Sequence, residues 1–218
     1  MRDSGSGRAH ALRWQSQSSL RACAVCLLSI PCLAQSSAVR HDRQELTRKL
    51  VTAAIERTHH HVRYVSGYVR IPYPGGDVPA DTGVCTDEII RIYRAVGIDL
   101  QKEVHEDMVQ NFDVYPHNWR RAPDTNIDHR RVPNLMLFFS RKGETLALTR
   151  RSEDYSPGDI VAWNLGGGIT HIGMVVDRRG TSGHYMVVHN IGHGPQMEDV
   201  LFDWAVIGHY RYHGPATF

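Results

Sequence analysis

The sequence predicts an α+β domain in which helices come first and antiparallel strands follow. Two observations support this prediction. Apolar residues recur at helical spacing between residues 41 and 111, whereas residues 160–212 hold four short apolar runs separated by glycine-rich turns. Because the two kinds of segment are segregated along the chain, we expect one helix to pack on a curved sheet. The sequence contains no internal repeat and no linker that would divide the domain.

The first helix is predicted over residues 41–61 from the spacing of Leu46, Leu50, Val51, Ala54 and Ile55. A loop follows over residues 71–83, where proline and glycine are too frequent for regular structure. The second helix is predicted over residues 85–96, ended by Gly97, and the third over residues 100–111.

The second half of the domain is predicted to consist mostly of strands. Residues 113–134 are polar and irregular, and residues 135–140 are expected to end a short helix. Strands are predicted over 160–163, 171–177, 185–191 and 206–212. The glycines at 166–168 and the segment 179–183 are expected to form hairpin turns.

Ahead of the domain, the first 34 residues have the features of a cleavable signal peptide. Four arginines are followed by an apolar run over residues 22–34, which is too short to span a membrane stably. The small residues Cys32 and Ala34 favour cleavage before Gln35, which leaves residues 35–218 as a periplasmic or secreted domain. An uncleaved anchor is the alternative. After cleavage we expect no stable membrane span, because no later segment has the ~18 apolar residues of a transmembrane helix.

Composition narrows the range of functions. The formal net charge of +2 falls to about −1 without the predicted signal peptide, and no basic run or stripe suggests nucleic acid as a partner. The 14 histidines are mostly scattered, and no pair has the spacing of a zinc motif. We therefore expect neither a metal nor an organic cofactor.

The candidate nucleophile is Cys85. It is the only cysteine outside the predicted signal peptide, in a compartment where thiols are normally paired. It also begins a predicted helix, whose free N–H groups favour a thiolate and can stabilise an oxyanion. Such placement, with an imidazolium nearby, can lower a cysteine pKa from ~8.5 to roughly 3.5–7.5. The alternative is a buried cysteine that acts as a small hydrophobic residue.

Two histidines are candidates for the base and its orienting partner. His171 begins one predicted strand, and His189 interrupts the next. A cysteine nucleophile needs such a base, and the base needs a group that orients its ring. Because side chains alternate along a strand, only one of His189 and Asn190 can meet His171, and His189 is the favoured partner. The alternative for each histidine is an ordinary strand residue.

The order of these motifs resembles that of the NlpC-type papain-like cell-wall peptidases. The matching segments are Tyr73-Pro-Gly-Gly76, Gly83-Val-Cys-Thr-Asp87, Pro157-Gly-Asp-Ile-Val161 and His171-Ile-Gly173, followed by a further histidine. The resemblance implies a papain-like fold in which the nucleophile helix packs on the sheet. It also implies that Tyr73 is a pocket residue whose hydroxyl supports the oxyanion, although a loop residue that merely packs is the alternative.

A closer resemblance is to a bacterial family known as domain of unknown function 1287. The segments that carry it are 75–81, 83–87, 104–108, 124–134 and 189–192. This resemblance implies the fold and the cysteine–histidine site, but it supplies no substrate. The chain departs from the NlpC pattern at Val84, Thr86 and Asp87, where that pattern has Asp, Ser and Gly.

Further residues are candidates for substrate binding. Thr86 and Asp87 flank the nucleophile, where side chains line the acyl-donor pocket. Arg130 and Arg131 can together grip a carboxylate, for which a solvated loop with an internal salt bridge is the alternative. Asn190 is a weaker candidate.

Together these observations predict an exported cysteine hydrolase that cleaves an amide bond through an acyl-enzyme, with a Cys-His-His site of Cys85, His171 and His189. The expected substrate is a peptide bond in peptidoglycan stem peptides, which rests on location and resemblance. Two alternatives stay open. The same site could transfer the acyl group to an acceptor other than water, or the domain could bind a cell-wall or carboxylate ligand without turnover.

Overall fold

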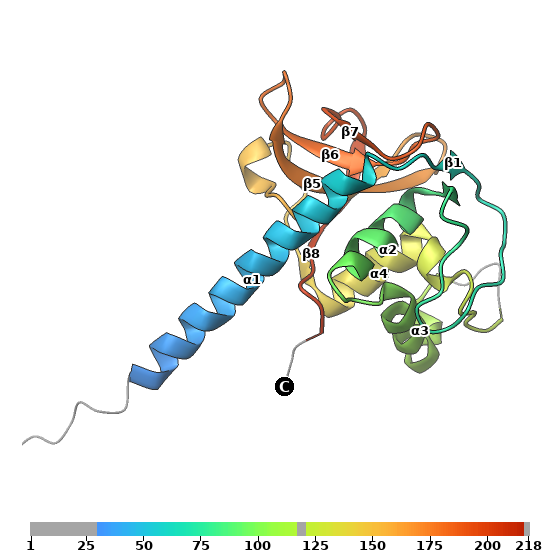
Figure 1. Ribbon diagram of the computed structural model, residues 1–218, viewed down its shortest axis with the longest axis horizontal. Helices are drawn as coiled ribbons and strands as arrows, with labels where there is room; N and C mark the ends of the chain where they lie inside the picture. Colours follow the sequence, from blue (N-terminus) through green and yellow to red (C-terminus); the bar gives the residue numbers. More distant parts are fainter. Residues whose placement is uncertain (1–29, 117–120, 216–218) are drawn as a thin grey trace, which may run out of the picture. The chain divides into compact units, whose positions relative to one another are not determined.

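The computed structural model describes the backbone of residues 30–116 and 121–215, and the side chains of those residues from Ala38 onward (Figure 1). The chain divides into two units, residues 1–37 and 38–218. The predicted signal peptide, residues 1–34, lies mostly outside the described residues. The structure describes only the backbone of its last five residues, 30–34, which form part of a helix. The following account concerns the unit that begins at Ala38.

The helices and strands follow one another as the α+β prediction requires. The longer helices are α1 (Ile30–Arg57), α2 (Cys85–Ala95), α3 (Leu100–Gln110) and α4 (Val132–Lys142). Short helical turns are η1 (Phe112–Val114), η2 (Asp128–Arg130) and η3 (Ser152–Asp154). The strands are β1 (Arg63–Tyr64), β2 (Thr82–Gly83), β3 (Glu144–Thr145), β4 (Ile160–Asn164), β5 (Thr170–Arg179), β6 (Tyr185–His189), β7 (Gln196–Glu198) and β8 (Ala205–Arg211).

The main sheet has six antiparallel strands in the order β3-β8-β4-β5-β6-β7. Hairpins at the two predicted turns join β4 to β5 and β5 to β6. A separate two-residue parallel pair, β1 with β2, sets Tyr64 opposite Gly83, two residues before Cys85. This small pair therefore positions the segment before α2 against the start of that helix.

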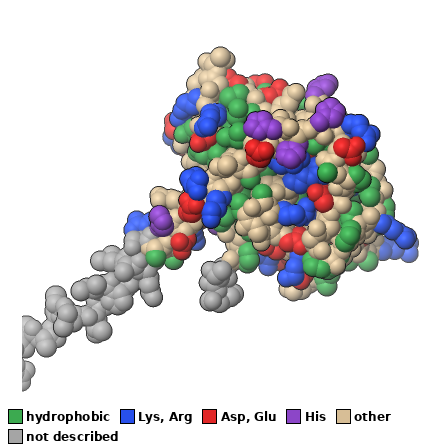
Figure 2. Space-filling view, viewed as in Figure 1, with side chains coloured by type: hydrophobic (Ala, Val, Ile, Leu, Met, Phe, Trp, Pro, Cys, Tyr) green, Lys and Arg blue, Asp and Glu red, His purple; other side chains and the backbone are tan. Residues whose placement is uncertain are grey.

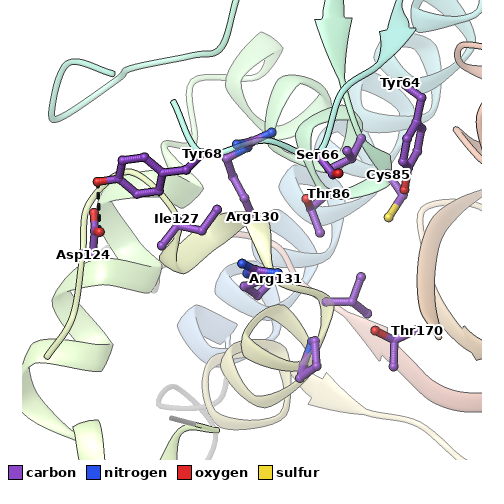
Figure 3. Close-up of a pocket in the computed structure, with 13 residues that line it drawn as sticks. Tyr64, Ser66, Tyr68, Cys85, Thr86, Asp124, Ile127, Arg130, Arg131 and Thr170 are labelled. Carbon is purple, nitrogen blue, oxygen red and sulfur yellow. Dashed lines mark hydrogen bonds between the residues drawn. The ribbon is translucent and has the colours of Figure 1, made fainter. Parts of the chain in front are cut away.

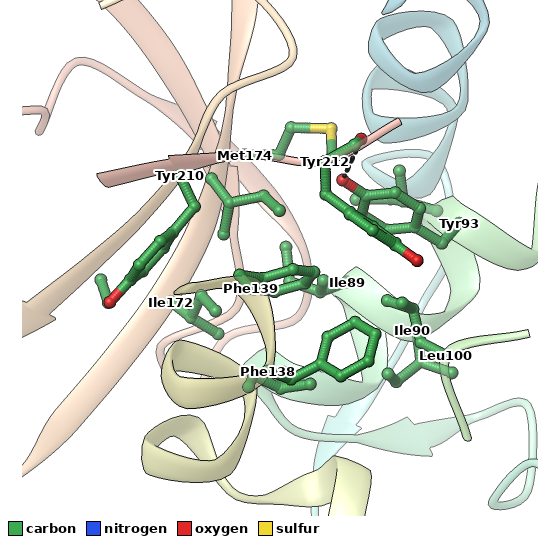
Figure 4. Close-up of a cluster of buried hydrophobic side chains, with 14 of the residues drawn as sticks. Ile89, Ile90, Tyr93, Leu100, Phe138, Phe139, Ile172, Met174, Tyr210 and Tyr212 are labelled. Atoms are coloured by element: carbon green, nitrogen blue, oxygen red, sulfur yellow. Dashed lines mark hydrogen bonds between the residues drawn. The ribbon is translucent and has the colours of Figure 1, made fainter. Parts of the chain in front are cut away.

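Helix α2 packs on the main sheet through the apolar face that its sequence predicts. Ile89, Ile92 and Tyr93 are buried, at the i, i+3, i+4 spacing of one helical stripe. They share a core with Ile172 and Met174 of β5, as Figure 4 shows. The prediction that the nucleophile helix packs on the sheet is confirmed.

The opposite face of the sheet is also covered. A second cluster of buried residues gathers around Trp163 and includes Tyr155, Val161, Val175, Val187 and Leu201. Because both faces of β4 and β5 are buried, their sequences are nearly continuous runs of apolar residues. They do not show the alternation of apolar and polar residues that is typical of a strand with one exposed face.

Three predicted segments differ from the structure. Helix α1 starts at Ile30 and ends at Arg57, because residues 58–60 form turns to carbonyls three residues back. Helix α4 includes residues 135–140, which were expected to end a short helix, and continues to Lys142; a proline lies in its first turn, where a missing N–H costs nothing. Within the middle region, predicted to be polar and irregular, Asp128–Arg130 form the short helical turn η2 and are buried.

On the face shown in Figure 2, basic and acidic side chains are interspersed, with no continuous basic stripe. None of the helices in the described part of the chain combines the length and the apolar character needed to cross a membrane.

Candidate functional site

A pocket of about 750 Å³ opens at the start of α2 (Figure 3). Its lining comes from segments far apart in the sequence: Tyr64, Ser66, Tyr68, Val84, Cys85, Thr86, Asp124, Ile127, Arg130, Arg131, Val132, Pro133 and Thr170. Its volume lies within the ~300–1,000 Å³ that is usual for ligand sites. The start of the predicted nucleophile helix thus lies at a cavity large enough for part of a peptide.

Cys85 lies at the wall of this pocket and is only 4% exposed. The backbone of Ile172 and of Thr86 and the hydroxyl of Tyr64 are close enough to the sulfur to favour its thiolate form. Strand β6 ends at His189, which pairs with Gly173 of β5. Ile172, the residue before Gly173, therefore has no paired residue on β6. The thiol therefore lies beside the end of β6, where β5 still has a free edge.

The acidity of Cys85 differs from the prediction. Burial raises the pKa of the thiol to about 11, although the hydrogen bonds from Ile172, Tyr64 and Thr86 act to lower it. The cost of placing a charge in a desolvated site outweighs the helix-terminus effect on which the prediction rested. In the resting protein Cys85 is therefore a protonated thiol.

His171 and His189 are in contact. Nε2 of His171 lies 2.8 Å from Nδ1 of His189, so one ring donates a hydrogen bond to the other. Asn190 lies differently, since its Oδ1 accepts a hydrogen bond from the N–H of Gly192. The His171 ring also stacks on Trp163 at 5.7 Å, which fixes its orientation.

Burial disfavours the charged form of both imidazoles. Burial, together with the neighbouring His189, lowers the pKa of His171 to about 3. Burial also lowers the pKa of His189, and the charge of Glu198 opposes that shift. Oε2 of Glu198 lies 2.9 Å from Nε2 of His189, but the two groups do not have the alignment of a hydrogen bond. This glutamate on β7 extends the row of polar groups behind His171.

His171 lies on β5 between a residue that lines the pocket and a residue whose backbone is beside the thiol. The residue at the pocket is its predecessor, Thr170, and the residue beside the thiol is its successor, Ile172. The side chain of Ile172 faces the helices, whereas the ring of His171 lies on the face of the sheet that holds Trp163. Strand β5 thus brings His171 within one residue of two positions, Thr170 at the pocket and Ile172 beside the thiol.

Tyr73 does not lie at this site. It is 40% exposed and packs edge-on against His105, with ring centroids 5.1 Å apart. Tyr64, rather than Tyr73, is the tyrosine whose hydroxyl lies beside Cys85. The reason is the β1–β2 pairing, which brings Tyr64 next to Gly83, whereas the Pro- and Gly-rich loop carries Tyr73 away.

Asp87 and Arg130 are paired with each other rather than free for a ligand. Nε and Nη2 of Arg130 donate to the two oxygens of Asp87 at 2.8 and 3.0 Å, and both side chains are buried. Asp87 also accepts the N–H of Val84, and Arg130 also donates to the carbonyl of Gly67. Asp87, a weak candidate for substrate binding, thus has both carboxylate oxygens hydrogen-bonded inside the fold.

Thr86 and Arg131 do line the pocket. Two further residues of the site were missed by the sequence reasoning, Tyr64 and Glu198. Tyr64 carried no signal because a two-residue strand is invisible to periodicity, and Glu198 because β7 has only three residues.

Gly173 tightens the site in a way that can be tested. A Cβ at this position would lie 2.7 Å from Cγ1 of Val187 and 3.1 Å from Cβ of His189. Side chains of β6 therefore occupy the space in which a side chain at position 173 would lie. Gly173→Ala should lower the free energy of unfolding by about 1–3 kcal/mol, as for other overpacked sites. Urea denaturation measures this loss, and an unchanged midpoint would show that β6 moves freely.

No group of three or more His, Cys, Asp and Glu side chains within residues 38–116 and 121–215 is arranged to hold a metal ion.

Comparisons with known proteins complete the description of the site. The model of a family described as "Domain of unknown function (DUF1287)" matches residues 51–212. The uncharacterized protein YijF of Escherichia coli (strain K12) is 53% identical over 150 residues, which cover 68% of this chain and 73% of YijF.

Solved structures show more distant similarity. NlpC1 from Trichomonas vaginalis aligns with a TM-score of 0.38 and 19% identity, over 73% of this chain and 42% of that one. An N-acetylmuramoyl-L-alanine amidase from Bacteroides uniformis aligns with a TM-score of 0.48 and 12% identity, over 77% of this chain and 98% of the amidase. The chain thus spans less than half the length of NlpC1.

Proposed function

For this chain, which belongs to the family described as "Domain of unknown function (DUF1287)", we propose the function of an exported cysteine hydrolase that cleaves an amide bond in peptidoglycan stem peptides. One observation carries the proposal. A single described cysteine lies at a helix start and at the wall of a peptide-sized pocket, and its backbone neighbour Ile172 directly follows His171, one member of a hydrogen-bonded histidine pair.

The proposed reaction begins from neutral groups. Since Nε2 of His171 is engaged by His189, Nδ1 is the nitrogen left to accept a proton from Cys85. Burial raises the pKa of Cys85 and lowers the pKa of His171, so both groups start without charge. Proton transfer creates thiolate and imidazolium together, and their attraction in a desolvated site offsets part of the desolvation cost.

The sulfur then attacks the carbonyl carbon and the carbon–oxygen π electrons move onto oxygen. The N–H groups at the start of α2 and the hydroxyl of Tyr64 can stabilise this oxyanion. Collapse of the intermediate expels the amine, which takes the proton from His171. Water, deprotonated by His171, attacks the thioester, releases the carboxylic acid and restores the thiol.

The test is mass spectrometry of purified sacculi and free muropeptides after incubation with the protein and with Cys85→Ala. Fragments that require Cys85 would establish the hydrolase, and their masses would identify the bond. If neither protein releases fragments from any of these substrates, the peptidoglycan proposal is wrong.

One observation favours a second candidate, a cell-wall binding module without turnover. Cys85 is deeply buried and its pKa is raised, as expected of a cysteine that serves only packing. Retention of the protein on sacculi, unaltered in Cys85→Ala and without fragments, would support this candidate over the hydrolase.

The raised pKa predicts how Cys85 reacts with iodoacetamide. Because only the thiolate is alkylated, the rate constant should rise about tenfold per pH unit across the neutral range and level off only near pH 11. Stopped-flow alkylation followed by mass spectrometry measures this profile. A plateau below pH 8 would show instead that an imidazolium already ionises the thiol at rest.

A further inference from the structure

We infer that Arg131 and Thr86 form a binding site for a carboxylate of the substrate, on the wall of the Cys85 pocket. The inference rests on the proposed function, since it names the chemical feature that a substrate of this site should carry. It also gives different roles to the adjacent Arg130 and Arg131: Arg130 forms a buried ion pair inside the fold, and Arg131 binds the ligand.

Arg131 is the cation that remains available in the pocket. It is exposed, it lines the same cavity as Cys85, and in the described part of the chain it has no ion-pair partner. Its backbone caps the start of α4, where its carbonyl accepts the N–H groups of Asn134 and Leu135. The main chain of Arg131 is therefore fixed while its guanidinium stays free for a ligand.

The other charged groups of the pocket are already engaged inside the fold. The guanidinium of Arg130 is neutralised by Asp87 in a buried pair. Asp124 accepts hydrogen bonds from the hydroxyl of Tyr68 and from Asn126. With Arg130 matched by Asp87, Arg131 supplies a positive charge that can attract an anionic group.

A second, independent observation comes from Thr86. Its Oγ1 is buried, yet it has no hydrogen-bond partner among the described residues, and Thr86 lines the pocket. A buried polar group without a partner is costly, so such a group at a cavity indicates a ligand that satisfies it. Thr86 lies in the first turn of α2, where the helix dipole also favours a negative charge.

These features fit a carboxylate better than a neutral group. A guanidinium binds a carboxylate through two parallel hydrogen bonds, and a hydroxyl can donate a further one. Figure 3 shows Thr86 beside Cys85 and Arg131 across from them, so an anion held between them lies close to the thiol. A peptide with a free carboxylate near its scissile bond would satisfy both groups.

The experiment measures binding apart from cleavage. Calorimetry on Cys85→Ala protein compares a muramoyl tetrapeptide with free carboxylates and the same compound with those carboxylates amidated. We expect the carboxylate form to bind about 10- to 100-fold more tightly, the range for a charged hydrogen bond. Adding Arg131→Gln should remove this preference, and adding Thr86→Val should weaken it.

Two control variants sharpen the comparison. Arg131→Lys keeps the charge without the two-pronged geometry and should retain part of the preference. Arg178→Gln removes an exposed arginine that is paired with Asp177 and should leave the preference unchanged.

Equal affinity for the two peptides, absence of binding by both, or a preference that survives Arg131→Gln would each overturn the carboxylate site. Cleavage by the protein with Cys85 intact is assayed in parallel on both peptides. Cleavage without a carboxylate preference would leave the hydrolase standing and reject the site. Binding with the preference but without cleavage would keep the site and reject the hydrolase.

Discussion

His171→Ala is expected to slow cleavage of the substrate by about 10²- to 10⁴-fold, the usual contribution of a general base. The effect should be this large because burial raises the pKa of the Cys85 thiol to about 11, so the reaction needs a base to remove its proton in the neutral range. The rate constant kcat, measured by chromatography of muropeptide products, reports the loss.

The pH profile of this variant separates a base from a merely structural residue. Without His171, solvent must ionise the thiol, so activity should recover as the pH rises towards the thiol pKa of about 11. His209→Gln is a matched control, because His209 is equally buried but bonds Asp159 away from the pocket. A His171→Ala protein that retains full activity at neutral pH would exclude His171 as the base.

The elements that place the cysteine and the histidine pair were predictable from sequence because each depends on a local pattern. The helix that begins at Cys85 follows from Ile89, Ile92 and Tyr93 at helical spacing. The contact between His171 and His189 follows from two neighbouring strands joined by a short turn. In both cases the interacting residues belong to long or directly connected elements.

The residues that sequence reasoning misplaced depend on contacts between distant segments. Tyr64 reaches Cys85 only because two short strands pair in parallel, which no local pattern reveals. Arg130 forms an ion pair with Asp87, 43 positions away in the sequence. Because of this pair, the segment around Arg130, which was expected to be polar and irregular, is buried. The acidity of Cys85 was misjudged for a related reason, since a sequence shows the helix start but not the depth of burial.

Arg130→Gln should lower the free energy of unfolding by about 3–5 kcal/mol, the loss that follows when one partner of a buried ion pair is removed. Asp87 would keep its charge in a desolvated position, where the N–H of Val84 would be the remaining hydrogen-bond donor to its carboxylate among the described residues. The carbonyl of Gly67 would also lose its donor, so the segment that carries Tyr64 should loosen. Urea unfolding measures the first effect, and faster alkylation of Cys85 reports the second.

The double variant Arg130→Met with Asp87→Leu tests the cause of this loss. If the loss comes from an unpaired charge, replacing both partners by apolar residues should recover much of it. A change below about 1 kcal/mol for Arg130→Gln is typical of an exposed pair and would mean that water reaches these groups.

Arg131→Gln should leave the free energy of unfolding nearly unchanged, because its guanidinium makes no ion pair within the described residues. Stability and carboxylate binding therefore distinguish an arginine that holds the pocket together from its neighbour that can receive a ligand.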